Sequence, residues 1–313
     1  MAAPDSGDSH GHQSFWVWVL CLTGVDYFST LGYQPSMAFE ATGRLAPLAT
    51  VLLVLVTLFG ALPVYCYVAG QSFQGQGSIS MLEKLVHGWT GKFLVLALLG
   101  FAATDYVITK TLSAADAAEH LLHNPLWQSH APEWLQGQAL LTMFLLVFLG
   151  AVFLKGFSEV IGLAIALVAV YLTLNAVVIG SGLAYLAQHP AAITDWWHKA
   201  QAGEWMLTHS PVKGTGWGAV ALVCVLFFPK LALGLSGFET GVAVMPLIRG
   251  NPSDTIDQPT GRIRNARKLL ISAAGIMSLY LLGSSMVVTT LIPSEELQIG
   301  GAAANRALAY LSH

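Results

Sequence analysis

Long apolar stretches separated by short polar segments repeat along the whole chain. A membrane-spanning α-helix needs about 20 apolar residues. Stretches of about this length or longer cover residues 15–42, 47–70, 93–114, 137–155, 159–186, 216–246 and 267–291. The pattern predicts an all-α integral membrane protein with about seven transmembrane helices.

Three polar segments add detail to this prediction. Residues 1–14 are polar, and we expect them to form a disordered cytoplasmic tail. Residues 71–92 mix Gly and Gln with a short amphipathic stretch, which is typical of a helix lying on the membrane surface. The segment DWWHKAQAGEW, residues 195–205, carries three tryptophans and is typical of a loop that rests on the outer lipid headgroups.

Composition and charge agree with a membrane protein. Of the 313 residues, 55% are hydrophobic and 10% are charged, whereas soluble domains are roughly 25% charged. The first fourteen residues contain no Lys or Arg, so the basic region of a cleavable signal peptide is missing. The net charge of −3 includes no basic run suited to nucleic acid. The lipid bilayer is therefore the expected partner.

The positive charges predict the orientation, because basic residues gather in cytoplasmic loops. With a cytoplasmic amino terminus, the inner loops hold eight basic residues and the outer loops hold four. We therefore expect a multi-pass protein of the plasma (inner) membrane with its amino terminus in the cytoplasm. The inner residues are Lys84, Lys92, Lys155, Arg249, Arg262, Arg264, Arg267 and Lys268, and the outer ones are Arg44, Lys199, Lys213 and Arg306.

Two predicted spans are interrupted by glycines, hydroxyls and a proline around a carboxylate. The first contains GVDYFSTLGYQPS, residues 24–36, with Asp26, and the sixth contains PKLALGLSGFETG, residues 229–241, with Glu239. Matched interruptions are typical of inverted-repeat transporters, in which two broken helices meet at the bilayer midplane and hold substrate and ion. The sequence therefore predicts a transporter with a binding site between these two spans.

Asp26 is the leading candidate for an ion or proton site. A carboxylate at mid-membrane is costly, so it usually faces the bundle interior and marks an ion or proton pathway. The alternative is a protonated Asp26 that only caps amides of the broken helix. Tyr33 follows seven residues later and would share a face with Asp26 in a continuous helix. A break at Gly32 would change that geometry, and Tyr33 could bind a cation or simply pack.

The third predicted span carries a polar stripe. Asp105, Thr109 and Ser113 lie at i, i+4 and i+8, on one face of a helix. Two hydroxyls beside an acid suit a partly dehydrated cation or a proton relay. The alternative is that both hydroxyls bond to carbonyls of their own helix.

Lys110 is unusual because no acid occupies its i±3 or i±4 positions. A lysine this deep should pair with an acid on another helix or extend outward to the headgroups. We predict that Asp26 or Glu239 approaches its ammonium within about 4 Å. Lys230 lies nearer the outer half of its span, where extension to the headgroups accounts for it.

Motifs of catalysis and metal binding are missing from the sequence. There is no H-E-x-x-H, G-x-S-x-G or P-loop motif, and no Cys/His cluster has zinc spacing. The three cysteines lie within predicted spans and form no disulfide framework. We expect no enzyme activity, no cofactor and no metal beyond a monovalent cation at Asp26.

Four motifs resemble those of a known family, over residues of about 15 to 290. The first span has the pattern D-x-x-S-x-x-x-Y-x-P, which resembles the first helix of the KimA-type potassium importers, a branch of the amino acid–polyamine–organocation (APC) transporter superfamily. DYVIT followed by Ser113 is similar to their third helix, and Ser236-Gly-Phe-Glu239 stands where they carry Thr-Gly-x-Glu. GRIRNARKLL, residues 261–270, resembles the basic start of their seventh helix. In the first span the pattern is formed by Asp26, Ser29, Tyr33 and Pro35.

The resemblance implies a LeuT-type fold with five-plus-five inverted repeats and proton-coupled potassium uptake by alternating access. Lys110 stands where the importers have an apolar residue, and related APC permeases carry amino acids, so an APC-type amino-acid permease is the alternative. The implied potassium ligands are Asp26, Tyr33, Thr109, Ser113 and Ser236, and the implied protonatable residues are Asp26, Asp105 and Glu239.

The LeuT-type fold needs ten core helices, so this chain is expected to be an amino-terminal fragment of a longer protein. Residues 292–313 would then be an extracytoplasmic segment before an eighth helix, and the full-length protein could form a homodimer. An inactive truncated membrane fragment is the second alternative. A channel is a further rival, but it needs a continuous polar pore, whereas the polar residues here gather at one depth.

Overall fold

All regular elements in the described part of the chain are helices. An isolated backbone bridge joins Ser14 to Ile248, and no β-strand occurs among the described residues. The predicted all-α class is therefore confirmed for this part of the chain. The computed structural model describes residues 13–86, 88–154, 157–207, 212, 214–232, 237–255 and 257–312.

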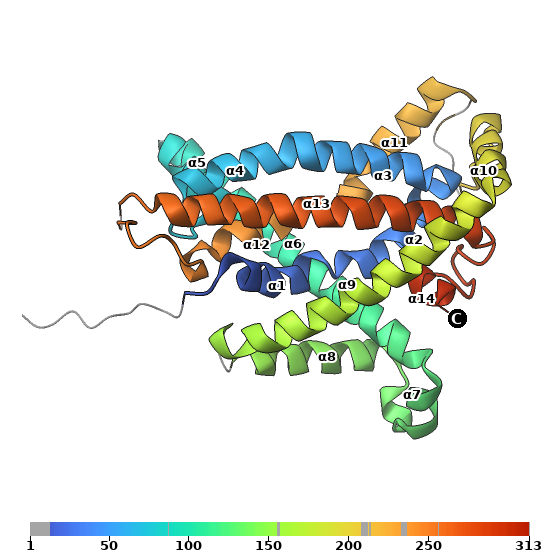
Figure 1. Ribbon diagram of the computed structural model, residues 1–313, viewed down its shortest axis with the longest axis horizontal. Helices are drawn as coiled ribbons and strands as arrows, with labels where there is room; N and C mark the ends of the chain where they lie inside the picture. The colour runs from blue at the N-terminus through green and yellow to red at the C-terminus, as the bar shows by residue number, and fades with distance from the viewer. Residues whose placement is uncertain are drawn as a thin grey trace, which may run out of the picture.

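Several helical stretches are long and apolar enough to cross a membrane. The first of them turns back at Gly43–Leu45, so the chain passes the bundle twice within it (Figure 1). Their length and composition agree with the predicted membrane-embedded protein. The long stretches are Trp16–Gln71, Gly88–Leu122, Ile161–Gln188 and Thr260–Leu291, and the shorter apolar helices are Gln138–Val152 and Trp217–Leu231.

The first predicted span is broken, as its glycines and hydroxyls indicate. It forms α1 (Trp16–Tyr27) and α2 (Thr30–Thr42), separated by a turn at Phe28 and Ser29. The break therefore lies before Gly32. The Ser29 hydroxyl donates to the Asp26 carbonyl oxygen at 2.8 Å, which satisfies a backbone acceptor at this break.

The segment that precedes α1 is held by backbone pairing. Ser14 N–H donates to the Leu247 carbonyl at 2.8 Å, and Arg249 N–H donates to the Ser14 carbonyl at 2.9 Å. The last two residues of the predicted tail, residues 13 and 14, are therefore ordered against the segment that follows α12. Residues 1–12 lie outside the described residues.

The chain returns through α3 (Ala46–Val56), a π-helical turn and α4 (Leu62–Gln71), and then forms α5 (Gly77–Leu85). Gly43 permits the reversal before α3, because its φ of +56° is rare for other residues and an added Cβ would overlap the Trp205 carbonyl oxygen. The short helix predicted within residues 71–92 is confirmed by α5.

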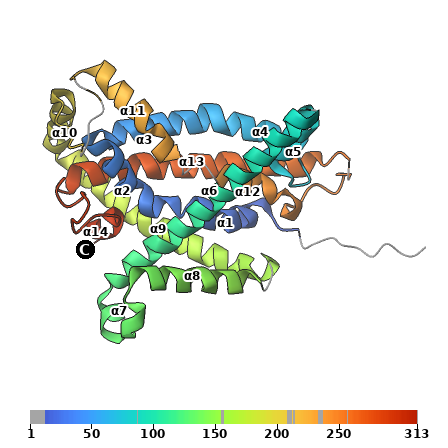
Figure 2. The ribbon, with the colours of Figure 1, turned by 180° about the vertical axis from the view of Figure 1, so that it is seen from behind.

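The next four helices are α6 (Gly88–Leu122), α7 (Pro125–His130), α8 (Gln138–Phe153) and α9 (Phe157–Gln188). α6 crosses the bundle diagonally and packs on α8 (Figure 2). It extends beyond the predicted span of 93–114 at both ends. At the carboxyl end, the alanine-rich sequence continues the helix. α9 packs on α1.

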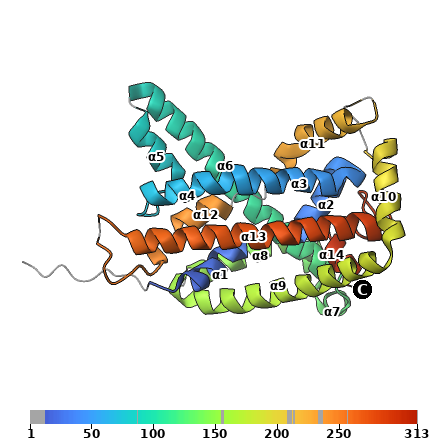
Figure 3. The same cartoon turned by 45° about the horizontal axis from the view of Figure 1, so that its top comes forward.

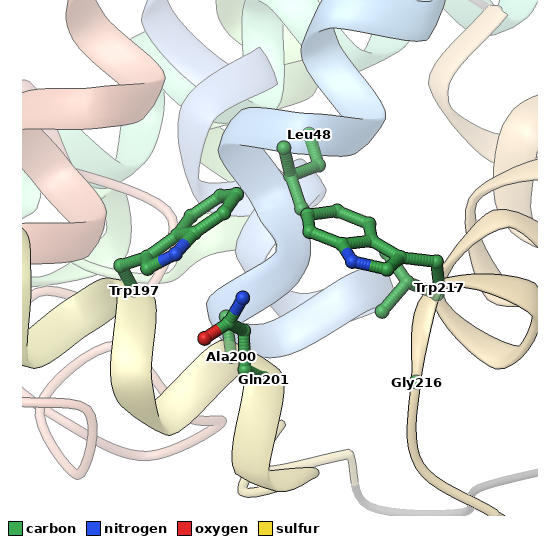
Figure 4. Close-up of a pocket in the computed structure, with 7 residues that line it drawn as sticks. Leu48, Trp197, Ala200, Gln201, Gly216 and Trp217 are labelled. Carbon is green, nitrogen blue, oxygen red and sulfur yellow. The ribbon is translucent and has the colours of Figure 1, made fainter.

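The tryptophan-rich segment forms helix α10 (Pro190–Ala202) and not the loop that we predicted. Trp196 and Trp205 are buried, and their indole N–H groups donate to carbonyls within the protein. Only Trp197 reaches the periphery, where its ring lies 5.2 Å from that of Trp217 beside Gln201 (Figure 4). The segment therefore closes one end of the bundle, because two of its three tryptophans pack against protein.

The sixth predicted span is also interrupted. It contains α11 (Trp217–Leu231) and α12 (Gly237–Ala243), and residues 233–236 between them lie outside the described residues. α12 packs on α1 and α11 packs on α2. Gly237 permits the first contact, because an added Cβ would overlap the Tyr27 ring. The first half of each interrupted span therefore packs on the second half of the other.

Helix α13 (Thr260–Leu291) is the core of the bundle and packs on α2, α3, α4 and α9 (Figures 1 and 3). Thr50 donates to Ser285 at 3.1 Å between α3 and α13. After α13 the chain folds back, and α14 (Ala307–Leu311) packs on α2, with Ala307 N–H donating to Ser36 Oγ at 3.2 Å.

Candidate functional site

The centre of the site is the Asp26 carboxylate, which lies near the end of α1, two residues before the break. Asp26 is 7% exposed. Its Oδ1 accepts from the Lys110 ammonium of α6, and its Oδ2 accepts from Thr240 Oγ1 of α12 at 3.0 Å. One carboxylate therefore joins the first interrupted span to α6 and to the second interrupted span.

The ion pair between Asp26 and Lys110 confirms the prediction that Lys110 pairs with an acid on another helix. Asp26 is buried, whereas the Lys110 side chain is 44% exposed. A buried carboxylate needs a partner, because leaving it unpaired in an apolar environment costs several kcal/mol. Lys110 supplies that partner and still keeps part of its surface accessible.

The ion pair opens onto a cavity of about 670 Å³. Asp26, Lys110, Thr240 and Tyr106 supply polar groups to its wall, and the rest of the wall is almost entirely apolar. A mostly apolar cavity with a few polar groups is the usual form of a small-molecule site. The apolar wall consists of Leu22, Val25, Leu149, Ala243, Val244, Pro246 and Leu247.

One of the predicted hydroxyl residues on α6, Ser113, faces the broken span. Ser113 Oγ lies 3.2 Å from Ser29 Oγ. Because Ser29 gives its single proton to the Asp26 carbonyl at 2.8 Å, Ser113 is the donor in this pair. Thr109, one turn earlier, is buried. Ser113 of the α6 stripe therefore lies against the break.

Glu239 faces protein but does not approach Lys110. Its Oε1 accepts from Ser78 N–H at 2.9 Å and its Oε2 accepts from Ser78 Oγ at 3.0 Å, at the amino-terminal end of α5. Negative charge is favourable at a helix amino terminus. Both acids thus face protein, but of the two only Asp26 forms the pair with Lys110.

Asp105 lies with Glu239 at a second cavity of about 480 Å³. Tyr106 lines this cavity and also the one beside Asp26. Asp105 is half-buried, unlike the next member of its stripe, Thr109. The three predicted protonatable residues are therefore divided between two neighbouring cavities that share one tyrosine.

One predicted ligand, Tyr33, is not brought to the carboxylate. Tyr33 is buried, and its hydroxyl donates to Thr30 Oγ1 at 3.4 Å on its own helix. The expected shared face with Asp26 assumed a continuous helix, but the helix breaks before Tyr33. Ser236 lies outside the described residues.

Two contacts were missed or wrongly predicted. Thr240 was not among the predicted site residues, although it follows Glu239 directly in an interrupted span, where hydroxyls often face a ligand. Lys230 was predicted to extend to the headgroups, but its ammonium lies 2.8 Å from Glu40 Oε1. That acid is 190 residues away in sequence, so no local sequence pattern indicates this ion pair.

No family model, curated protein or solved structure matches this chain. Its membership of the APC superfamily therefore stays a prediction based on sequence motifs.

Proposed function

We propose that this chain belongs to a secondary active transporter of the APC superfamily with a LeuT-type fold, in the plasma membrane, which moves a small solute by proton-coupled alternating access. One observation carries the proposal. The Asp26 carboxylate at the break of the first span receives donors from α6 and from α12, which belongs to the second interrupted span.

This geometry suits alternating access, because the site depends on how the two interrupted spans pack. α1 lies on α12 and α2 lies on α11, on opposite sides of the break. A tilt of α1 away from α12 would separate Asp26 from Thr240, and a tilt of α2 would separate Ser29 from Ser113. A solute or proton that changes the charge of Asp26 would therefore favour one packing over the other.

The geometry favours a zwitterionic apolar amino acid as the solute. Its ammonium group can pair with Asp26 and its carboxylate with Lys110, so each partner of the existing ion pair receives an opposite charge. The apolar remainder of the 670 Å³ cavity suits an aliphatic side chain. Asp26, Asp105 and Glu239 are the candidate carriers of the coupled proton.

Potassium is the second candidate, because the motifs resemble those of potassium importers. Thr240 donates to the Asp26 carboxylate, and Ser29 donates to the Asp26 backbone carbonyl. Hard monovalent cations prefer such oxygen ligands. In this case the half-exposed Lys110 must first leave the carboxylate. Lys110 already places a positive charge where potassium would bind, which is why the amino acid is preferred.

The test is solute uptake by the intact protein in proteoliposomes. Radiolabelled leucine, glutamate and rubidium are offered with and without an inward proton gradient. We expect gradient-driven uptake of leucine, and its loss in Asp26→Asn, because an amide neither binds an ammonium group ionically nor releases a proton. Asp195→Asn, an exposed acid on α10, is the matched control.

Each other outcome identifies a rival. Gradient-driven rubidium uptake without leucine uptake would favour the potassium importer. Flux independent of the proton gradient would favour a channel. A lack of uptake for every solute, from protein that elutes as a single folded species, would favour an inactive membrane fragment.

A further inference from the structure

The polar face of α6 continues past the site just described. Thr109, Ser113, Asp116 and His120 lie at i, i+4, i+7 and i+11, which is one face of an α-helix. This face points at α2, since Ser113 lies on Ser29 and α6 packs on α2. Figure 2 shows α6 running from the α5 end of the bundle, across α2, to the end that holds α7.

Asp116 is buried against the backbone of α2. Its side chain is 15% exposed, and its Oδ2 lies 3.6 Å from His120 Nε2. A Cβ added to Gly32 would lie 2.7 Å from the same oxygen, so only glycine permits this approach. Oδ1 is buried and has no hydrogen-bond partner.

A second side chain with an unpaired polar atom faces the same glycine from α9. The Tyr171 hydroxyl is buried without a hydrogen-bond partner and would lie 3.4 Å from a Cβ on Gly32. A buried polar group left without a hydrogen-bond partner destabilises the folded protein. Two such groups, a carboxylate oxygen and a hydroxyl, beside one glycine of α2 indicate a polar site with a function.

We propose that Asp116, with His120 and Tyr171, forms an outer proton-binding site that supplies Asp26. The inference rests on the proposed transport function and adds a second carboxylate to it. His120 lies at the outer end of the stripe and links Asp116 to the surface. Asp116 lies six residues beyond Lys110, about 9 Å along the helix axis, with Ser113 and Ser29 between them.

The proton transfer is balanced at every step. The Asp116 carboxylate takes up one proton from the outer solution and becomes a neutral carboxyl group. When the carboxyl group gives up that proton, the Asp26 carboxylate receives it. No electron moves, and Asp116 returns to a carboxylate.

Other charged groups surround the proposed site. Glu119 and His123 lie on α6 and pair with each other, with 3.5 Å between His123 Nδ1 and Glu119 Oε1. Arg306, just before α14, lies close enough to act electrostatically on His120, and Tyr33 of α2 lies near Tyr171. None of these four groups is hydrogen-bonded to Asp116 Oδ1, which stays available for a proton.

The test uses the intact protein and two readouts. Infrared difference spectroscopy follows the carbonyl band of protonated carboxyl groups as the pH is lowered, with no solute present. We expect a wild-type band that Asp116→Asn lacks and Asp195→Asn keeps. In proteoliposomes, Asp116→Asn should lower proton-driven uptake at least tenfold and keep solute exchange at zero proton gradient within about twofold, because exchange needs no net proton entry.

The outcomes separate this inference from the proposed function. If wild-type protein moves no solute but the band disappears in Asp116→Asn, the proton site stands and the transport proposal fails. An unchanged band or unchanged proton-driven uptake in Asp116→Asn overturns the proton site. If that variant does not fold, Tyr171→Phe decides, because loss of the neighbouring hydroxyl should shift the Asp116 band, and an unshifted band overturns the inference.

Discussion

The ion pair between Lys110 and Asp26 can be tested by removing each partner alone and then both. Lys110→Met keeps the length and apolar volume of the side chain but removes the charge. Asp26→Asn keeps the shape of the carboxylate and its hydrogen bond from Thr240. The double variant removes both charges and leaves neither stranded.

The size of each effect follows from burial. Breaking a fully buried pair from one side costs about 3–5 kcal/mol, because it strands the remaining charge. Lys110→Met strands the 7%-exposed Asp26, so we expect a loss of about 2–4 kcal/mol in the free energy of unfolding. Asp26→Asn leaves Lys110, which is 44% exposed and can turn to water, so we expect a loss of about 1 kcal/mol.

The assay is equilibrium unfolding of the purified protein in mixed micelles, followed by tryptophan fluorescence. The double variant should be more stable than Lys110→Met alone, with a coupling energy of at least about 1 kcal/mol. Lys230→Met is the matched control, because Lys230 and Glu40 are both partly exposed, and such pairs contribute about 0.2–1 kcal/mol.

Additive losses in the double-variant cycle would refute this reasoning. They would mean that the pair contributes no more than a surface contact. A Lys110→Met variant as stable as Lys230→Met would lead to the same conclusion, and the argument that Lys110 acts as a fixed charge at the site would then fail.

Three further predictions follow from single contacts. Thr240→Val should lower stability by about 1 kcal/mol, because Asp26 loses a hydrogen bond, whereas Thr240→Ser should not; unfolding in mixed micelles checks both. Gly237→Ala should cost about 1–3 kcal/mol through overlap with Tyr27, and a normal melting temperature would contradict the close packing of α1 on α12. Although partial desolvation opposes it, hydrogen bonds from backbone amides near and within the first turn of α13 lower the pKa of Asp254 below its usual 3.8. The ionised Asp254 carboxylate should therefore contribute its full stabilisation above its unfolded pKa of 3.8 and lose it as the pH falls through the lowered pKa of the folded state. Wild type and Asp254→Ala should then converge in melting temperature at low pH.

The sequence was sufficient to predict the ion pair of Lys110, because burying an unpaired charge is costly. Lys110 has no acid on its own helix, so a partner across the bundle was required, and Asp26 is that partner. The interruption of the first and sixth spans was visible as glycines, hydroxyls and carboxylates. The exact position of the first break was not visible: it lies before Gly32, directly after Tyr27, whose ring packs on Phe238 with ring centroids 5.6 Å apart.

Contacts between distant segments could not be predicted, because no local pattern encodes them. Glu239 was expected near the centre of the site, but Ser78 of α5 binds it from 161 residues away. Asp116 was overlooked for a different reason. Hydropathy ended the third span at residue 114, whereas α6 continues to Leu122 and carries Asp116 along its polar face.

Proton flux induced by the solute tests the central claim most directly. Proteoliposomes containing the intact protein and a trapped pH-sensitive dye are given leucine outside at equal pH on both sides. The account predicts that leucine acidifies the lumen in wild type and in Asp195→Asn, but not in Asp26→Asn, because each leucine enters with a proton that Asp26 must bind and release. Leucine uptake without acidification, or acidification that persists in Asp26→Asn, would contradict it.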